Sequence, residues 1–345
     1  MVKNSLIVFL LLISSAVGAQ VGGIGVYKFL NIPVSARVAS IGGNSIASFD
    51  NDINLAFQNP ALLHPSMNRQ ITFNYTNLVS DINAGYAGYC FHLDSIGTFA
   101  AGLQYLNYGT FDRSDVTGNK AGTFSAADYN LQIAYGNNFK KFRYGTNLKL
   151  ILSNLAEYQS IGISTDLCGS YVDTASRFTG SLVFKNIGFP IKNYVSGQHE
   201  NLPFEIQVGM AKQLAHLPLR FSIVYTNLQR FNIAYTNPNS PNQQIDLETG
   251  EPILKTPSFG DKLMRHFIFG GEFLFSKNFN LRVGYNYQRR REMQLFEKNG
   301  LAGFSWGVGI KISKFQFSYG GGRFAPGQTN QYFSVVSNLH SFRKS

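Results

Sequence analysis

Residues 280–288 read NLRVGYNYQ, and apolar and polar side chains alternate along this stretch. A period of two residues is typical of a β-strand whose two faces meet different environments. A strand that faces lipid on one side and a polar lumen on the other needs this separation. The apolar face carries Leu281, Val283, Tyr285 and Tyr287, and the polar face carries Arg282, Gly284, Asn286 and Gln288.

The same alternation recurs from Gln70 towards the end of the chain. Further apolar faces are formed by Ile71, Phe73 and Tyr75, by Leu131, Ile133 and Tyr135, by Ile206, Val208 and Met210, and by Phe315, Phe317 and Tyr319. The pattern predicts fourteen strands, near residues 70–80, 84–93, 96–108, 127–137, 141–154, 158–172, 177–186, 204–214, 218–228, 265–276, 279–289, 300–312, 314–322 and 331–341. An even number of strands is typical of bacterial barrels.

The connections between these strands alternate in length. Links after even-numbered strands are short, as at 94–95 and 277–278, whereas links after odd-numbered strands are mostly longer, as at 109–126, 187–203 and 229–264. A soluble β-sandwich also alternates, but short periplasmic turns opposite long extracellular loops are typical of a membrane barrel. We therefore expect an all-β fold, a 14-stranded antiparallel transmembrane β-barrel, over residues 70–345.

The low share of charged residues indicates that much of the protein surface faces something other than water. Charged residues make up 14% of the chain, whereas a soluble domain has roughly 25%. After residue 19 no apolar run reaches the roughly 18 residues that a transmembrane helix needs. A closed barrel is the other structure that satisfies every backbone hydrogen bond within a bilayer.

The first nineteen residues are expected to be a signal peptide, because Lys3 precedes the apolar run from Leu6 to Ile13 and small residues lead up to Gln20. Without Lys3, the mature chain has 29 Lys and Arg against 19 Asp and Glu, a net charge of +10. An exported basic protein meets anionic lipid rather than nucleic acid. We expect a location in the outer membrane, with the N-terminus in the periplasm and no nucleic acid as partner.

Residues 20–69 lack the alternation of the strands and are too few to bury a convincing core alone. We expect them to form an N-terminal plug in the mouth or lumen of the barrel. Within this segment, residues 22–63 combine Pro33-Val34-Ser35-Ala36-Arg37 with Gly42-Gly43, Asp50, Asp52 and Asn59-Pro60-Ala61.

This block resembles the start of the PorV/PorQ family of barrels, which belong to the type IX secretion system of Bacteroidetes. It is similar, more distantly, to FadL-type fatty-acid transporters, which share a fourteen-stranded barrel and an N-terminal hatch. The rest of the chain matches only in length and strand number.

The resemblance implies a non-enzymatic function in the attachment complex, where exported cargo is joined to lipopolysaccharide. Barrels of this family anchor cell-surface proteins, among them PorZ and the sortase PorU, so a PorZ-like protein is the implied partner, with PorU and PorV as further members of the complex. The alternative is a FadL-like transporter of a hydrophobic small molecule.

Four plug residues are expected to shape the backbone. Asn59-Pro60 predicts a turn that seats the plug, because Pro fixes its own φ and restricts the preceding residue; direct ligand contact is the alternative. Gly42-Gly43 permits a positive φ or a close passage along the barrel wall. A phosphate-binding loop is not expected there, because its lysine and hydroxyl residues are missing.

The remaining plug residues of the motif are charged. Arg37, Asp50 and Asp52 are expected to form ion pairs across the plug or with charges in the lumen, in preference to a ligand site. Cys90 and Cys168 lie singly in strand-like segments, and the six histidines show no metal-binding spacing. We therefore expect no catalytic site, no metal and no cofactor.

Two features are expected at the extracellular end. Arg289, Arg290 and Arg291 follow a predicted strand, with Lys298 in the same loop, and guanidinium groups bind phosphate in a bidentate manner. Contact with lipopolysaccharide is the sharper hypothesis, and a solvated rim is the alternative. The loop from Gln229 to Met264 is long for a turn and predicts either a docking surface for a partner or a disordered cap.

Overall fold

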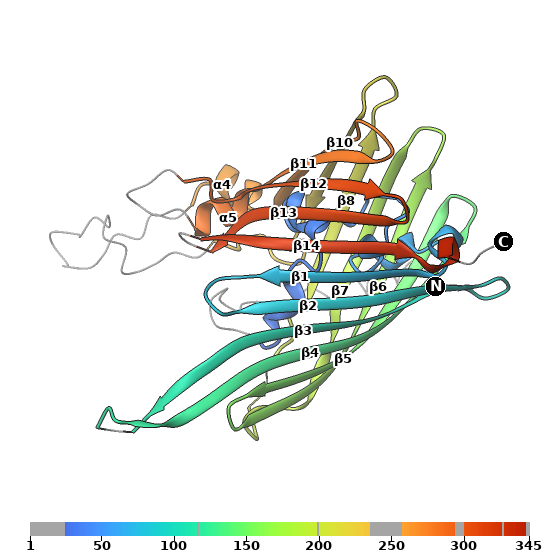
Figure 1. The fold of residues 1–345 in the computed structure, drawn as a ribbon. Coiled ribbons are helices and arrows are strands. Elements are labelled where there is room, and N and C mark those ends of the chain that lie inside the picture. The colour runs from blue at the N-terminus through green and yellow to red at the C-terminus, as the bar shows by residue number, and fades with distance from the viewer. Residues whose placement is uncertain are drawn as a thin grey trace, which may run out of the picture.

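The computed structural model describes residues 25–115, 117–198, 200–234, 257–293, 300–325 and 328–342. Fourteen antiparallel strands form one closed barrel, in which β1 pairs with both β2 and β14 (Figure 1). The strands are β1 Gln70–Asn77, β2 Asn83–Leu93, β3 Gly97–Ser114, β4 Lys120–Phe139, β5 Phe142–Leu155, β6 Tyr158–Asp173, β7 Phe178–Lys192, β8 Glu205–Gln213, β9 Leu219–Tyr225, β10 Phe267–Phe273, β11 Phe279–Asn286, β12 Phe304–Ile312, β13 Phe315–Ala325 and β14 Gln328–Asn338. The predicted fold class is confirmed.

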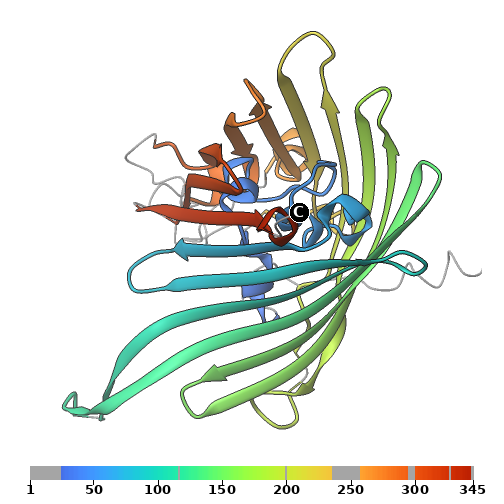
Figure 2. The same ribbon diagram turned by 45° about the vertical axis from the view of Figure 1, so that its right-hand side comes forward.

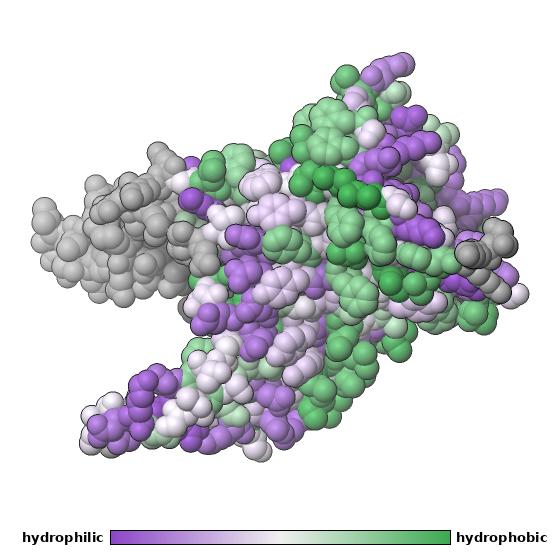
Figure 3. Space-filling model, viewed as in Figure 1, coloured by the Kyte–Doolittle hydropathy of each residue, from purple (hydrophilic) through white to green (hydrophobic). Residues whose placement is uncertain are grey.

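The strands separate apolar and polar side chains as their sequences predict. On β1 and β4, Phe73 and Ile133 point outwards and are 59% and 55% exposed, whereas Thr72 and Gln132 point inwards and are buried. Figure 3 shows that the outward residues form a hydrophobic band across the strands, with hydrophilic residues towards both ends. No helix in the described ranges is long and apolar enough to span a membrane.

The two ends of the barrel differ. The links after even-numbered strands, such as 94–96 and 140–141, define the short-turn end, and the links after odd-numbered strands define the long-loop end. β3 and β4 continue as one long hairpin through most of the link predicted at 109–126. Phe111 and Phe124 stack across this hairpin with ring centroids 5.2 Å apart, and such cross-strand aromatic pairs stabilise a sheet.

A second difference from prediction concerns the end of β11. The strand ends at Asn286, and α5, Tyr287–Glu292, follows it. The Asn286 side chain accepts a hydrogen bond from the Arg289 backbone, which is a standard cap at the start of a helix. The long loop between β9 and β10 also contains a short helix, α4 Phe259–Met264, while residues 235–256 of the predicted docking loop lie outside the described residues.

Residues 25–69 lie inside the ring of strands, as Figure 2 shows, and are called the plug below. The plug has short helices, which are η1 Lys28–Asn31, α2 Ala36–Ser40, α3 Ile53–Ala56, η2 Pro60–Leu62 and η3 Pro65–Met67. α2 packs against β11 to β14, α3 against β1 and β2, and η2 against β4 to β6. The plug therefore contacts most of the barrel wall, and its apolar residues form the core of the lumen together with inward-facing wall residues such as Tyr86 and Ala134.

The plug runs from the long-loop end to the short-turn end. The Val26 backbone donates to the Asn201 carbonyl in the loop between β7 and β8, and the segment ends where β1 begins at Gln70. The first described residues of the plug therefore lie at the long-loop end. The predicted signal peptide falls outside the described residues.

Candidate functional site: the plugged lumen

A charge cluster fastens the plug to the wall near the short-turn end. Arg37 on α2 binds Glu272 of β10 through two hydrogen bonds, from Nε to Oε2 at 2.9 Å and from Nη2 to Oε1 at 3.1 Å. The same guanidinium pairs with Asp50 at 2.8 Å and with Asp52 at 3.1 Å, both from the plug. This arrangement confirms the predicted ion pairs of Arg37, Asp50 and Asp52.

The wall contributes two further arginines to this charge cluster. Arg220 of β9 lies 2.8 Å from Asp50 and 3.2 Å from Glu272, and Arg282 of β11 lies 3.4 Å from Glu272. Burial alone would raise the pKa of Asp50, but the charges of Arg37 and Arg220 hold it well below its ordinary value. The Asp50 carboxylate therefore stays ionised. The buried Asp52 and Glu272 need their arginines because an unpaired buried charge is costly.

The two plug glycines pass close to other parts of the fold, Gly42 along the barrel wall, as predicted, and Gly43 beside α5. Gly42 and Gly43 have φ values of +96° and +88°, which favour glycine. A Cβ atom on Gly42 would lie 2.4 Å from Ile268, and one on Gly43 would lie 2.4 Å from Arg289. The Gly42 N–H donates to the Ser305 Oγ at 3.0 Å. Only a residue without a side chain fits this contact.

The Asn59-Pro60 turn seats the opposite side of the plug. The Asn59 Oδ1 accepts from the Ala61 N–H at 3.0 Å, and its Nδ2 donates to the Ile46 carbonyl at 2.6 Å and to the Ser170 Oγ at 2.9 Å. Asn59 is fully buried, so each of these polar groups needs its partner. The side chain therefore joins two plug segments to β6.

The structure does not bring the predicted lipopolysaccharide-binding arginines together as one exposed cluster. Arg289 points inwards and donates from Nη1 to the Gly42 carbonyl at 3.1 Å. Arg290 donates to the Gly300 carbonyl, and Arg291 pairs with Asp261 of α4 at 2.7 Å. These residues lie on α5, and a helix turns successive side chains in different directions. Lys298 lies outside the described residues.

Asp261 holds α4 and α5 together at the long-loop end. Besides Arg291, it accepts from the Arg265 Nε at 2.8 Å and from the Tyr287 hydroxyl at 2.9 Å. Burial alone would raise the pKa of Asp261, but these hydrogen bonds and the two arginine charges lower it. Part of the predicted docking loop is thus an ordered surface, which exposes Phe259.

An apolar cluster lies in the lumen at the long-loop end, beside buried polar residues such as Asp128 and Ser153. The wall residues Leu106 and Ile151 point inwards, are buried, and belong to one cluster with Tyr27 and Phe29 of the plug. Other apolar residues packed against this cluster are Val26, Leu30, Ile32, Leu78, Ile82, Tyr108 and Tyr194. We call this set the apolar mouth. A cavity of about 310 Å³ shares Ile32, Leu78 and Ile82 with it.

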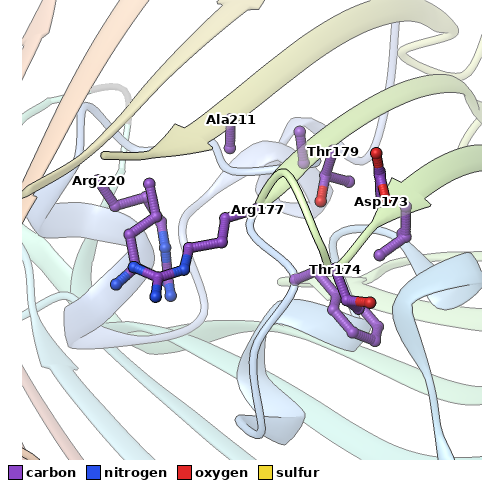
Figure 4. Close-up of a pocket in the computed structure, with 10 residues that line it drawn as sticks. Asp173, Thr174, Arg177, Thr179, Ala211 and Arg220 are labelled. Atoms are coloured by element: carbon purple, nitrogen blue, oxygen red, sulfur yellow. The ribbon is translucent and has the colours of Figure 1, made fainter. Parts of the chain in front are cut away.

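Among the described residues, two further cavities lie at the short-turn end. One of about 160 Å³ lies between the plug residue Phe49 and the strands β6 to β9. Figure 4 shows Arg177 and Arg220 on one side of it and Asp173 and Thr174 on the other. The second, of about 420 Å³, lies beside the charge cluster.

Sequence reasoning missed the wall side of this site. The missed residues are Arg220, Glu272 and Arg282, on the neighbouring strands β9, β10 and β11. Each lies at an inward-facing position of a strand in which apolar and polar residues alternate. A charged residue at such a position is the signal that marks it as a lumen residue. Leu106 and Ile151 carry no comparable signal, because an apolar residue at an inward position looks like a break in the alternation.

No protein-family model and no curated protein matches the chain. Among solved structures, the fold is similar to the toluene transporter TbuX of Ralstonia pickettii, with a TM-score of 0.55 and 12% identity over 90% of this chain and 100% of that one. It is also similar to the toluene transporter TodX of P. putida, with a TM-score of 0.56 and 14% identity over 90% of this chain and 99% of that one. This chain therefore has the barrel fold of these transporters along nearly its whole length.

Proposed function

We propose that this chain is an outer-membrane barrel that binds a hydrophobic small molecule at its long-loop end and admits it when the plug shifts. The apolar mouth carries this proposal. Buried apolar side chains from the wall and from the plug meet there, beside a cavity of about 310 Å³. That volume falls within the roughly 300–1,000 Å³ of small-molecule pockets. Its lining combines apolar residues such as Ile32, Leu78 and Ile82 with Lys28, Asn31, Arg289 and Asn330. An apolar ligand gains free energy by leaving water for the apolar part of this lining.

The similarity to two toluene transporters supports the same reading, because both combine this barrel fold with passage of an apolar compound. The tight packing of the plug limits how a ligand could pass through the lumen. Its central residues, such as Val38 and Leu55, are fully buried, so a ligand bound at the mouth needs a rearrangement of the plug before it moves further. In this proposal the long-loop end faces the cell exterior, and the protein is a transporter without catalytic activity.

The test is the rate at which bacteria that express the chain accumulate radiolabelled toluene. Cells with the wild-type chain should accumulate it several-fold faster than cells without the chain. Leu106→Asn places an amide in the apolar mouth and should remove most of this gain. The matched control is Leu217→Asn, because Leu217 is exposed in a short turn at the opposite end. Equal rates with and without the wild-type chain would refute the proposal.

A second candidate is the anchoring of a cell-surface partner, such as a PorZ-like protein of the type IX attachment complex together with PorU and PorV. The ordered surface formed by α4 and α5 favours it, because Asp261 fixes both helices and Phe259 is 71% exposed. Arg291 is 43% exposed, and in this candidate function it would contact lipopolysaccharide. Mass spectrometry of the complex extracted in mild detergent from the native organism tests this candidate, and recovery of the barrel alone would count against it.

A further inference from the structure

The cavity beside the charge cluster, at the short-turn end, has a lining with excess positive charge. Its volume is about 420 Å³, and five Lys or Arg side chains and three Asp or Glu side chains line it. The three carboxylates are paired with Arg37, Arg220 and Arg282. Lys277 and Lys311 form no ion pair within the described part of the chain, and both are exposed at the rim. The cavity therefore has two cations that no carboxylate balances.

Arg282 is a wall residue whose hydrogen-bonding capacity is only partly used. Its side chain is 1% exposed, and its Nε lies 3.4 Å from the Glu272 Oε2 without forming a hydrogen bond. Its Nη1 donates only a long bond, of 3.3 Å, to the Ser318 Oγ. A buried charged donor without an acceptor is unfavourable, so an incoming acceptor would gain the interaction that the protein leaves unmade.

Lys277, Arg282 and Lys311 line the same cavity. Lys277 lies in the turn between β10 and β11, Arg282 on β11 and Lys311 on β12, so the three come from adjacent parts of the wall. A guanidinium presents a planar pair of donors that matches the two oxygens of a carboxylate or phosphate, and lysines add point charges.

We propose that this cavity binds an oxyanion, the phosphate or carboxylate group of a small molecule, through Arg282, Lys277 and Lys311. A ligand that binds only the folded state stabilises it, so occupancy should strengthen the contact between the plug and the wall. The site lies at the end of the lumen opposite to the apolar mouth, and it does not depend on which of the two proposed functions is correct.

Isothermal titration calorimetry on the purified full chain in a neutral detergent tests the site, with inorganic phosphate and succinate as separate probes. Sodium chloride keeps the ionic strength constant, because salt screens such interactions. Saturable binding of phosphate alone assigns the site to phosphate groups, and saturable binding of succinate alone assigns it to carboxylates. The thermal unfolding temperature should rise with the concentration of the probe that binds.

The variant Lys277→Gln/Lys311→Gln should weaken binding by about tenfold, on the order of 1.4 kcal/mol. Both lysines are exposed, so this variant should fold normally. Lys140→Gln is the matched control, because Lys140 is exposed in another short turn at the same end and should leave the affinity unchanged. The proposal fails if neither probe binds saturably, or if the double variant and the control lose affinity equally.

Discussion

Arg37 of the plug and Glu272 of β10 are 235 residues apart in the sequence and are joined by two hydrogen bonds of 2.9 and 3.1 Å. Both side chains are almost completely buried. The pair is the centre of the charge cluster that joins the plug to the wall. It therefore helps to keep the plug inside the lumen.

Replacement of Arg37 should release the plug. Arg37→Gln leaves Asp52 buried without its cation and leaves Glu272 with only Arg220 and Arg282, a loss that costs about 3–5 kcal/mol. Thermal unfolding in detergent should show this loss, and limited proteolysis should cut the plug faster. The matched control is Arg113→Gln, because the Arg113 pair with Glu157 is exposed and contributes about 0–1 kcal/mol. Equal stability of the two variants would contradict the role of the cluster.

The close passage of Gly42 along the wall predicts a steric effect. Gly42→Ala forces a positive φ on a residue with a Cβ and pushes that atom against Ile268, which should destabilise the fold by about 1–3 kcal/mol. Gly85→Ala should change stability by less than about 0.5 kcal/mol, because no atom lies within 4 Å of the added Cβ. Chemical denaturation of both variants measures the difference, and a neutral Gly42→Ala would refute the tight contact.

Replacement of Asn59 should weaken the contact between the plug and β6, on the side of the plug opposite to the charge cluster. Asn59→Ala leaves the Ile46 carbonyl and the Ala61 N–H without their partners, at a cost of about 1–3 kcal/mol. Asn278→Ala, at an exposed position in a short turn, should be nearly neutral. Hydrogen exchange of residues 45–63 should accelerate in the first variant only; unchanged exchange there would show that Asn59 does not seat the plug.

His64 predicts a pH dependence of the plug. It is buried, with its Nδ1 2.8 Å from the Ser66 Oγ. Burial lowers the pKa of His64 from its ordinary 6.5; the hydrogen bond to the Asp50 carbonyl opposes this shift, and the Arg143 charge adds to it. The neutral form is thus favoured in the folded state. Its contribution to stability is complete above pH 6.5 and is lost as the pH falls through the lowered pKa.

Thermal unfolding at pH 7.5 and at pH 5 checks this dependence. The wild-type chain should lose more stability than His64→Gln over that interval, since the glutamine cannot take up a proton. Parallel losses in the two proteins would assign the effect to other groups.

The sequence predicts the barrel well because alternation and link length are local properties. Each of the fourteen strands lies where its alternating segment was expected, and Gly42 occupies the close contact that its residue type suggested. The sequence could not predict which wall residues join Arg37 in the charge cluster. Glu272 and Arg220 lie on strands that are distant in the sequence and that come close to the plug only when the barrel closes. Arg289 was assigned to the exposed rim because the cap at Asn286, which starts α5, was not recognised.

Single-channel recording in planar lipid bilayers tests most directly whether the barrel spans the membrane with its lumen closed by the plug. The wild-type chain should insert and show no steady conductance, while Arg37→Gln should show intermittent openings as the plug loosens. A steady current through the wild-type chain, of the size that an open porin carries, would contradict the account.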